Sequence, residues 1–267
     1  MVDCRYPKII TSQSYKLFSV IHLPSSDAGP FPVVILCHGL GGSKVGRFRY
    51  PIQLSEHLAK NGIASIRFDF RGNGDSEGSF VETTPESCVE DLKSIIKWVS
   101  EEALFDTSRL GLFGRSFGGV VSLLCAAENP KAISALAVQS PPFAFELYCI
   151  NQPSHIKIEE GAFFFEQEKM SQAFVDQISR LKMTSIMEGL HSIPFLHIGA
   201  GKDNVVHPDH AKEYEGVRKE TKAPTQFTLL PEADHNLSNI SDRQTALKES
   251  SNWFITHLNP SCALYLD

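Results

Sequence analysis

The chain has 267 residues, of which 42% are hydrophobic and 21% charged, and this composition is that of a globular protein rather than a disordered one. Its length allows one sizeable α/β domain or two small ones. The 25 Lys and Arg against 31 Asp and Glu give a formal charge of −6, which argues against nucleic acid or an anionic membrane surface as a main partner.

The cysteines do not suggest a disulfide framework. No C-x-x-C pair occurs among the six cysteines, and Cys37 and Cys125 lie inside apolar runs, where they are expected as small buried side chains. The N-terminus lacks the apolar segment of a signal peptide, and no run is long enough to span a bilayer. We therefore expect a cytoplasmic protein without a membrane span.

Runs typical of strands alternate along the chain with runs typical of helices. Expected strands are residues 16–24, 31–39, 63–70, 110–113, 133–138, 193–198 and 226–230. Expected helices are residues 50–62, a stretch from residue 85, a stretch after residue 119, and 243–258. This alternation predicts the α/β fold class, with a mostly parallel central sheet flanked by helices. Functional sites in such sheets lie beyond the carboxyl ends of the strands.

One segment interrupts the alternation. About fifty residues separate the expected strands near residues 138 and 193, many more than such connections usually have. We expect residues 140–192 to form an inserted cap or lid with its own short helices, and residues 1–139 and 193–267 to form the core domain.

The stretch "GRSFGG", residues 114–119, places a serine between glycines where an expected strand becomes a helix. G-x-S-x-G alone is a weak signal, but this strand–turn–helix context is that of a nucleophile elbow. Side chains at Gly114 and Gly118 would crowd so tight a turn. The alternative is an ordinary turn packed for contact between helix and strand.

A serine hydroxyl needs a base to take its proton, and the base needs a carboxylate to orient it. His235 follows the last expected strand and is the predicted base for Ser116. Asp203, just past the preceding strand, is the predicted acid. Asp209 and Asp234 are alternatives, but Asp209 is expected to cap the next helix, and Asp234 adjoins His235 too closely for a well-aligned bond to its ring.

Neither a metal nor a cofactor is expected. His207 and His210 have an i, i+3 spacing, but no further ligand pair supports a metal site, and Pro208 disfavours a regular helix there.

An oxyanion hole requires two donors aimed at the developing charge. The backbone N–H of Phe117, directly after the nucleophile, is one expected donor. The other is Leu40, in the glycine-rich stretch "LCHGLGGSK" of residues 36–44. A simple turn or a phosphate cradle are alternatives for this loop, but it lacks the glycine that a Walker A motif has before its lysine, and "RGNGDSEG" has Glu77 where G-x-G-x-x-G needs glycine.

Together these motifs resemble those of the α/β-hydrolase superfamily, and within it the small carboxylesterases of the cinnamoyl or feruloyl esterase type. Similarity to monoacylglycerol lipases and serine aminopeptidases is looser. The resemblance covers residues 15–260 and rests on "HGLGGS" (38–43), "FDFRGNGDSEG" (68–78), "GRSFGG" (114–119), "GAGKDNVV" (199–206) and "EADHN" (232–236). Ser116, Asp203 and His235 follow the family's order. Arg115 stands where many of these esterases have histidine, and the insert shows no pattern that can be aligned.

The resemblance implies a serine hydrolase that cleaves small-molecule carboxylic esters through an acyl-enzyme. Aromatic residues of the insert are expected to line the pocket and favour small to medium hydrophobic acyl or aryl groups; they are Phe143, Phe145, Tyr148 and Phe164, with Phe163 and Phe165 beside them. The alternative for these rings is a lid core packed on itself.

Other functions on the same scaffold stay open. An amidase, a thioesterase or a serine aminopeptidase would use the same triad, and Glu146, Glu159 or Glu160 could then bind the substrate amine. A catalytically silent binding protein is the alternative outside enzymes. The sequence also leaves a homodimer open.

Overall fold

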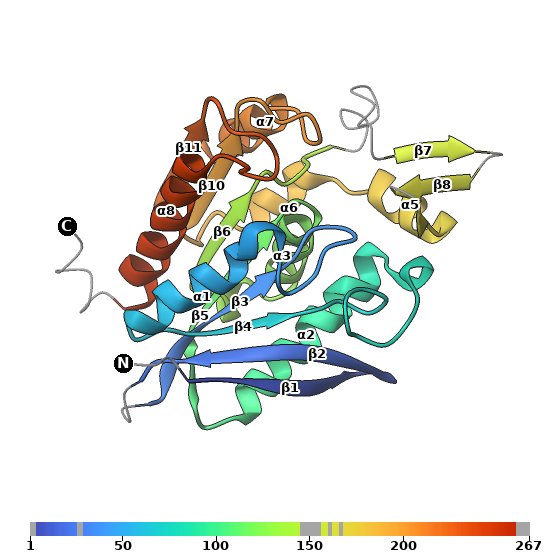
Figure 1. Cartoon of the computed structure of the whole chain (residues 1–267). Helices are drawn as coiled ribbons and strands as arrows, with labels where there is room; N and C mark the ends of the chain where they lie inside the picture. Colours follow the sequence, from blue (N-terminus) through green and yellow to red (C-terminus); the bar gives the residue numbers. More distant parts are fainter. Residues whose placement is uncertain (1–3, 26–28, 145–155, 160–161, 166–167, 260–267) are drawn as a thin grey trace.

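A central eight-stranded sheet organises the protein (Figure 1). The structure is a computed structural model that describes residues 4–25, 29–144, 156–159, 162–165 and 168–259. The strands of the sheet are β1 (Cys4–Ser12), β2 (Tyr15–Leu23), β3 (Phe31–Cys37), β4 (Ala64–Phe68), β5 (Phe105–Arg115), β6 (Ala135–Gln139), β10 (Phe195–Ala200) and β11 (Thr225–Leu230). Their spatial order is β1-β2-β4-β3-β5-β6-β10-β11.

In this spatial order, the six strands β4-β3-β5-β6-β10-β11 are parallel to one another. At one edge, β1 pairs antiparallel with β2, and β2 pairs antiparallel with β4. Every residue of β3, β4, β6 and β10 is buried, as expected for parallel strands covered on both faces. The sequence did not predict β1, because its exposed and half-buried residues give no continuous apolar run. As an edge strand it also tolerates Pro7, whose nitrogen cannot donate to a ladder.

Helices cover both faces of the sheet. On one face, α1 (Tyr50–Lys60) contacts α8 (Ile240–Leu258); on the other, α2 (Pro85–Glu101) contacts α3 (Phe117–Glu128). Each pair belongs to its own cluster of buried hydrophobic residues. The remaining short elements of the core are α7 (Asp209–Arg218) and the 3-10 helices η1 (Arg47–Arg49), η2 (Phe80–Glu82) and η3 (Pro130–Ala132). No helix in the described part of the chain is both long and apolar enough to cross a bilayer.

The segment between β6 and β10 contains strands as well as the expected helices. An antiparallel sheet of β7 (Ile156–Glu159), β8 (Ala162–Phe165) and β9 (Glu168–Lys169) precedes α5 (Gln172–Ser179) and α6 (Met183–Gly189). The three consecutive phenylalanines of β8 favour a strand over a helix. Phe174 of α5 and Met183 and Met187 of α6 belong to the α2–α3 hydrophobic cluster. This part of the segment therefore packs onto the core.

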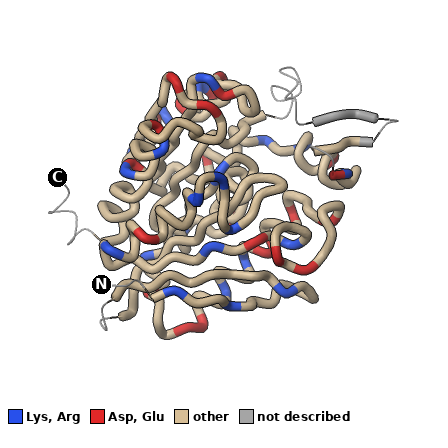
Figure 2. Tube along the Cα trace, viewed as in Figure 1, with Lys and Arg blue, Asp and Glu red and all other residues tan. Residues whose placement is uncertain are grey.

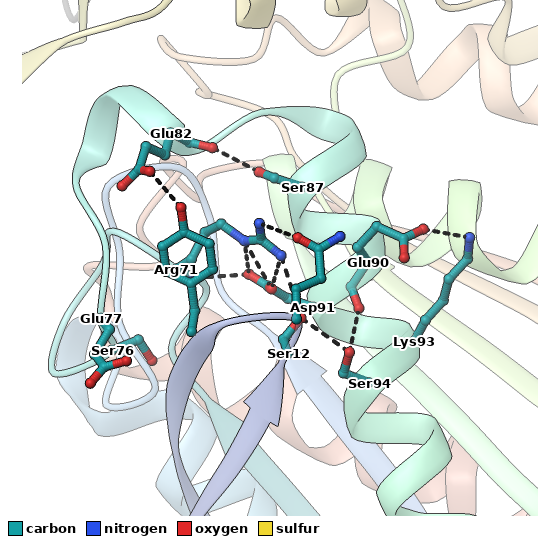
Figure 3. A network of polar contacts seen from close by, with 12 residues as sticks. Ser12, Arg71, Ser76, Glu77, Glu82, Ser87, Glu90, Asp91, Lys93 and Ser94 are labelled. Atoms are coloured by element: carbon teal, nitrogen blue, oxygen red, sulfur yellow. Dashed lines mark hydrogen bonds and ion pairs between the residues drawn. The ribbon is translucent and has the colours of Figure 1, made fainter.

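A buried ion pair holds the turn after β4 against α2 (Figure 3). Arg71 Nη2 donates to Asp91 Oδ1 at 2.6 Å, and the Arg71 backbone N–H donates to Asp91 Oδ2 at 2.9 Å. Arg71 also reaches the hydroxyl of Ser12 in β1. Because both charges are buried, removing either partner would leave the other uncompensated. The interaction fixes the backbone of the turn, and neither side chain lies in the cavity described below.

Candidate active site

Ser116 lies in a strained turn between β5 and α3. Its backbone φ of 52° and ψ of −125° are values that residues other than glycine rarely adopt. The Ser116 N–H donates to the Gln139 carbonyl at 2.8 Å. A Cβ at Gly114 would lie less than 3.0 Å from the backbone of α3, and one at Gly118 equally close to the carbonyls of Cys37 and His38. The two glycines are therefore required by the close approach of three backbone segments.

Asp203 and His235 form a buried hydrogen-bonded pair. His235 Nδ1 lies 2.7 Å from Asp203 Oδ2, and the two residues are 6% and 5% exposed. The other carboxylate oxygen, Oδ1, accepts from the N–H groups of Val205 at 2.9 Å and Val206 at 2.7 Å. Since Nδ1 donates to a carboxylate, a neutral His235 has its accepting lone pair on Nε2. This is the tautomer that a general base needs.

The two alternative acids occupy other positions. Asp209 is the first residue of α7 rather than its cap, and its exposed carboxylate accepts from Lys212 Nζ at 2.6 Å. Asp234 Oδ1 accepts from the N–H groups of Asn236 and Ser238, and so stabilises the loop that carries His235.

A cavity of about 550 Å³ opens beside the elbow. Ser116, His235, Leu40, Phe117 and Phe143 all line it.

Two expected pocket residues, Phe145 and Tyr148, lie outside the described residues. Phe164 is not among the cavity-lining residues, whereas its neighbour Phe165 is. Successive residues of a strand face opposite ways. Phe163 and Phe165 pack against the α2–α3 hydrophobic cluster, whereas Phe164 does not. The sequence identified the aromatic cluster, but neither the strand that it forms nor which face of that strand points inward.

Two backbone N–H groups in the cavity wall lack acceptors. Leu40 follows β3 and Phe117 is the first residue of α3, and within the described residues neither N–H donates a hydrogen bond. First-turn amides of a helix have no partner inside the helix. These are the two groups that the sequence indicated as oxyanion donors.

Buried His38 shapes the loop that carries Leu40. Its Nε2 accepts the Phe70 N–H at 3.1 Å, so its Nδ1 is the donor to the Gly39 carbonyl at 2.7 Å. Burial lowers the pKa of His38 below its ordinary value, although the bond to Gly39 opposes the shift. The neutral ring therefore holds the Gly39 carbonyl in place, and with it the N–H of Leu40, which belongs to the same planar peptide group.

Asp69 fixes the far end of the same loop. Its side chain is fully buried and accepts from both the backbone N–H and the ammonium of Lys44. Arg67 Nη1 donates to the Lys44 carbonyl at 2.7 Å, and Asp75 is a second carboxylate on the ammonium. Burial alone would lower the pKa of Lys44, but the bonds to the two carboxylates outweigh it and raise the pKa. Lys44 thus stays charged and anchors the loop.

Arg115 links the elbow to the histidine loop, a role that the sequence did not reveal. Its Nη2 donates to the His235 carbonyl at 2.9 Å and to Asn236 Oδ1 at 2.7 Å. Burial lowers the pKa of Arg115 to about 10, against the opposing effect of the Asp203 charge, so the guanidinium remains charged at neutral pH. The one available sequence signal was a charged residue at the end of an otherwise apolar strand.

His207 and His210 have separate contacts. His210 is buried and its Nδ1 accepts the Phe143 N–H at 2.9 Å, whereas the half-exposed His207 lies beside Asp209. Among the described residues, no group of three or more His, Cys, Asp or Glu side chains is arranged to hold a metal.

Comparison with known proteins defines the family of this site. The model of the X-Pro dipeptidyl-peptidase (S15) family matches residues 14–180. The chain belongs to the S15 family. The matched residues include Ser116, Leu40 and Phe117, whereas Asp203 and His235 lie beyond them.

Relatives of this S15 family member extend over most of its length. An uncharacterized 31.7 kDa protein of Escherichia coli is 25% identical over an alignment of 270 positions, gaps included. This alignment covers 85% of this chain and 91% of that protein. The acylamino-acid-releasing enzyme of Sus scrofa is 24% identical over 85% of this chain and 31% of its own length.

Solved structures share the fold. The structure of Est1E from Butyrivibrio proteoclasticus with bound ferulic acid has a TM-score of 0.78 at 17% identity, covering 94% of this chain and 98% of the other. The protein thus has the α/β-hydrolase fold, and its S15 family match makes it a serine hydrolase of the esterase or peptidase type.

Proposed function

We propose that the protein hydrolyses small-molecule carboxylic esters, with Ser116 as nucleophile, His235 as general base and Asp203 as the carboxylate that orients it. The observation that carries this proposal is the Asp203–His235 pair at 2.7 Å, whose histidine shares a cavity wall with the strained Ser116. This pairing leaves His235 in the tautomer that can take a proton from a serine hydroxyl.

The reaction has two halves. Ser116 Oγ attacks the ester carbonyl while its proton moves to His235 Nε2. The carbon–oxygen bond to the alcohol then breaks, and the alcohol leaves with that proton. In the second half, water attacks the acyl-enzyme and gives a proton to His235, which returns it to Ser116 as the carboxylic acid departs. One water is consumed, and acid and alcohol are released.

The N–H groups of Leu40 and Phe117 are the proposed oxyanion donors. Both lack an acceptor in the described part of the chain, and both residues line the cavity with Ser116. Donors that are held in place before the reaction need no reorganisation when charge develops on the carbonyl oxygen. The contacts of His38 and Asp69 supply that rigidity on the Leu40 side.

The acyl or aryl group would be small to medium and hydrophobic. The cavity wall contains Phe117 and Val120 of α3 and Phe143, Phe174 and Ile178 of the segment between β6 and β10. We propose that residues 140–192 act as a cap over the core formed by residues 1–139 and 193–267. Support comes from the contribution of this segment to the cavity wall and from its length.

A peptidase acting with the same residues is the second candidate, and the family match favours it. A peptidase that recognises a free amino group would need an acidic side chain near the nucleophile. Within the described residues, no Asp or Glu lines the cavity. The side chains of Glu146, Glu159 and Glu160 lie outside the described part.

Turnover of a substrate panel by wild type and Ser116→Ala tests the proposal. The panel contains short-chain, long-chain and cinnamoyl-type esters, an aminoacyl anilide and an X-Pro anilide. We expect cleavage of at least one ester class by wild type, and none by Ser116→Ala, whose thermal melt should match wild type. Anilide cleavage without ester cleavage would establish the second candidate. Ester turnover retained by Ser116→Ala would contradict both.

A further inference from the structure

The two walls of the cavity differ in chemistry. On the α2–α3 face of the sheet its lining is apolar, with Val120, Phe174 and Met183 as examples. On the α1–α8 face the lining includes Arg47, which precedes α1, and Arg115 at the end of β5. The cavity therefore straddles the carboxyl edge of the sheet. Its two arginines lie on the α1–α8 side, called the basic wall below, beside apolar lining residues of that face: Leu36, Tyr50, Phe113 and Leu237.

Strand alternation places Gln139 beside Arg115 on the basic wall. Phe113 of β5 and Ala137 of β6 belong to the α1–α8 hydrophobic cluster. Arg115 and Gln139 lie two residues further along these strands, so their side chains face the same way. The two residues are also paired in the register of β5 and β6, and both line the cavity.

The charge of this wall is not balanced by acidic residues. No Asp or Glu lines the cavity within the described part of the chain, although the whole protein has a net charge of −6. Figure 2 shows basic residues at the beginning of α1, whereas acidic residues gather on the turn before α2 and around α7.

Lys44 differs from the two arginines in having ion pairs with carboxylates. Lys44 is paired with Asp69 and Asp75. For Arg47 and Arg115, in contrast, no carboxylate oxygen of the described residues lies within 4.0 Å. Asp203 is the carboxylate whose charge acts most on Arg115, and it is already engaged by His235 and two backbone N–H groups.

Arg115 and Gln139 also have hydrogen-bonding groups that no described residue uses. A guanidinium carries five N–H donors, and the two acceptors of Arg115 among the described residues are both reached by Nη2. Gln139 is 1% exposed, yet neither its Oε1 nor its Nε2 has a hydrogen-bond partner among the described residues. Buried polar groups without partners are rare in folded proteins, and each calls for an explanation such as strain, a catalytic role or a bound water or ion. Positive charge focused in a cleft attracts anionic ligands.

We propose that Arg47, Arg115 and Gln139 form a subsite for a carboxylate group of the substrate, so that the preferred ester carries a carboxylate in addition to its ester bond. This inference rests on the proposed function, because it assigns a substrate class to the same site. A planar carboxylate matches the geometry of a guanidinium and can also accept from an amide NH2.

Matched pairs of esters test this assignment. Monomethyl adipate against methyl hexanoate places the carboxylate in the acyl part, and 4-acetoxybenzoate against 4-acetoxybenzamide places it in the alcohol part. For wild type we expect kcat/KM to favour the anionic member of at least one pair about fivefold or more, and high salt to reduce this preference. The pair that shows the preference identifies the part of the ester that faces the basic wall.

Two variants and one control assign the preference to the subsite. Arg47→Gln should reduce the anionic-to-neutral ratio of kcat/KM about three- to fivefold. The control is Arg49→Gln, which removes the same charge two residues away at an exposed position that does not line the cavity. It should have a smaller effect.

Gln139→Leu should also reduce the ratio, while the thermal melt stays the same or rises because an unpaired buried amide is removed. A purely structural Gln139 would instead lower the melt and leave the ratio unchanged.

The results separate this inference from the proposed function. Equal rates for anionic and neutral members of both pairs in wild type would overturn the subsite but leave the esterase intact. The same holds if Arg47→Gln and Arg49→Gln change the ratio equally. Cleavage of no ester by wild type would overturn both.

Discussion

Replacement of Asp203 by asparagine should remove most of the turnover, because the structure restricts how the new amide can face. Asp203 Oδ1 accepts two backbone N–H groups, those of Val205 and Val206, while Oδ2 accepts from His235. An asparagine that keeps both backbone bonds must turn its NH2 group towards His235 Nδ1. The ring would then carry its proton on Nε2, where it cannot accept the proton of Ser116.

The alternative orientation of the amide is unfavourable. If the NH2 group faces Val205 and Val206, two N–H donors lose their acceptor, at about 1–3 kcal/mol each. The productive tautomer would then be disfavoured by roughly 30-fold to more than 10,000-fold. Loss of the negative charge beside the imidazolium adds to this, so we expect kcat to fall about 10,000-fold in total.

Steady-state hydrolysis of a neutral 4-nitrophenyl ester measures this loss, with a thermal melt beside it. The melt should stay near wild type because the side chains are nearly the same size. Asp209→Asn is the matched control, since Asp209 is exposed and pairs with Lys212, and it should retain full activity. If Asp203→Asn kept more than about a tenth of the wild-type kcat, or if Asp209→Asn were equally impaired, this account of the acid would be refuted.

Three further predictions follow from the packing around the site. Arg115→Lys should lower kcat for a neutral ester about tenfold with little change in KM, because an ammonium holds the His235 carbonyl and Asn236 less well than a guanidinium; an unchanged kcat would show that the histidine loop needs no such anchor. Gly118→Ala should destabilise the protein by about 1–3 kcal/mol, because its Cβ would meet backbone carbonyls. Gly216→Ala, in α7 with open space around it, should instead be neutral or stabilising in the same melt. Burial lowers the pKa of His197 to about 4, below its unfolded value of about 6.5, so its stabilising contribution is complete above pH 6.5 and is lost as the pH falls towards 4. Between pH 6.5 and pH 4 the free energy of unfolding of wild type should therefore fall by about 3 kcal/mol more than that of His197→Phe. Melting temperatures of the two proteins across this range measure the difference, and an equal decline in both would contradict the assignment.

Much of the site was predictable because its parts are local in the chain. The glycines around Ser116 are required by backbone contacts within the elbow and with the end of β3, and strand–turn–helix patterning locates such a turn from sequence alone. The predicted strands 31–39 and 63–70 match β3 and β4 to within a few residues, because parallel strands buried on both faces are continuous apolar runs.

Side-chain partners that come from distant segments were not predictable. Arg115 and Asn236 are separated by 121 residues, and they meet because the order of the sheet and the path of the last loops bring them together. Which of Phe164 and Phe165 faces the cavity depends on the placement of β8. Because consecutive residues of this strand are all apolar, the sequence shows no alternation of polar and apolar residues that would indicate the inward face.

The sequence by itself determined the fold class, the elbow and the order of the proposed catalytic residues, since these depend on propensity, apolar periodicity and turn chemistry within short stretches. Only the tertiary structure decided that Asp203 is the carboxylate bonded to His235, that Arg115 anchors the histidine loop and that the cavity has one basic wall. Those outcomes depend on which distant segments share one edge of the sheet, and that is set by the packing of the whole core rather than by any local pattern.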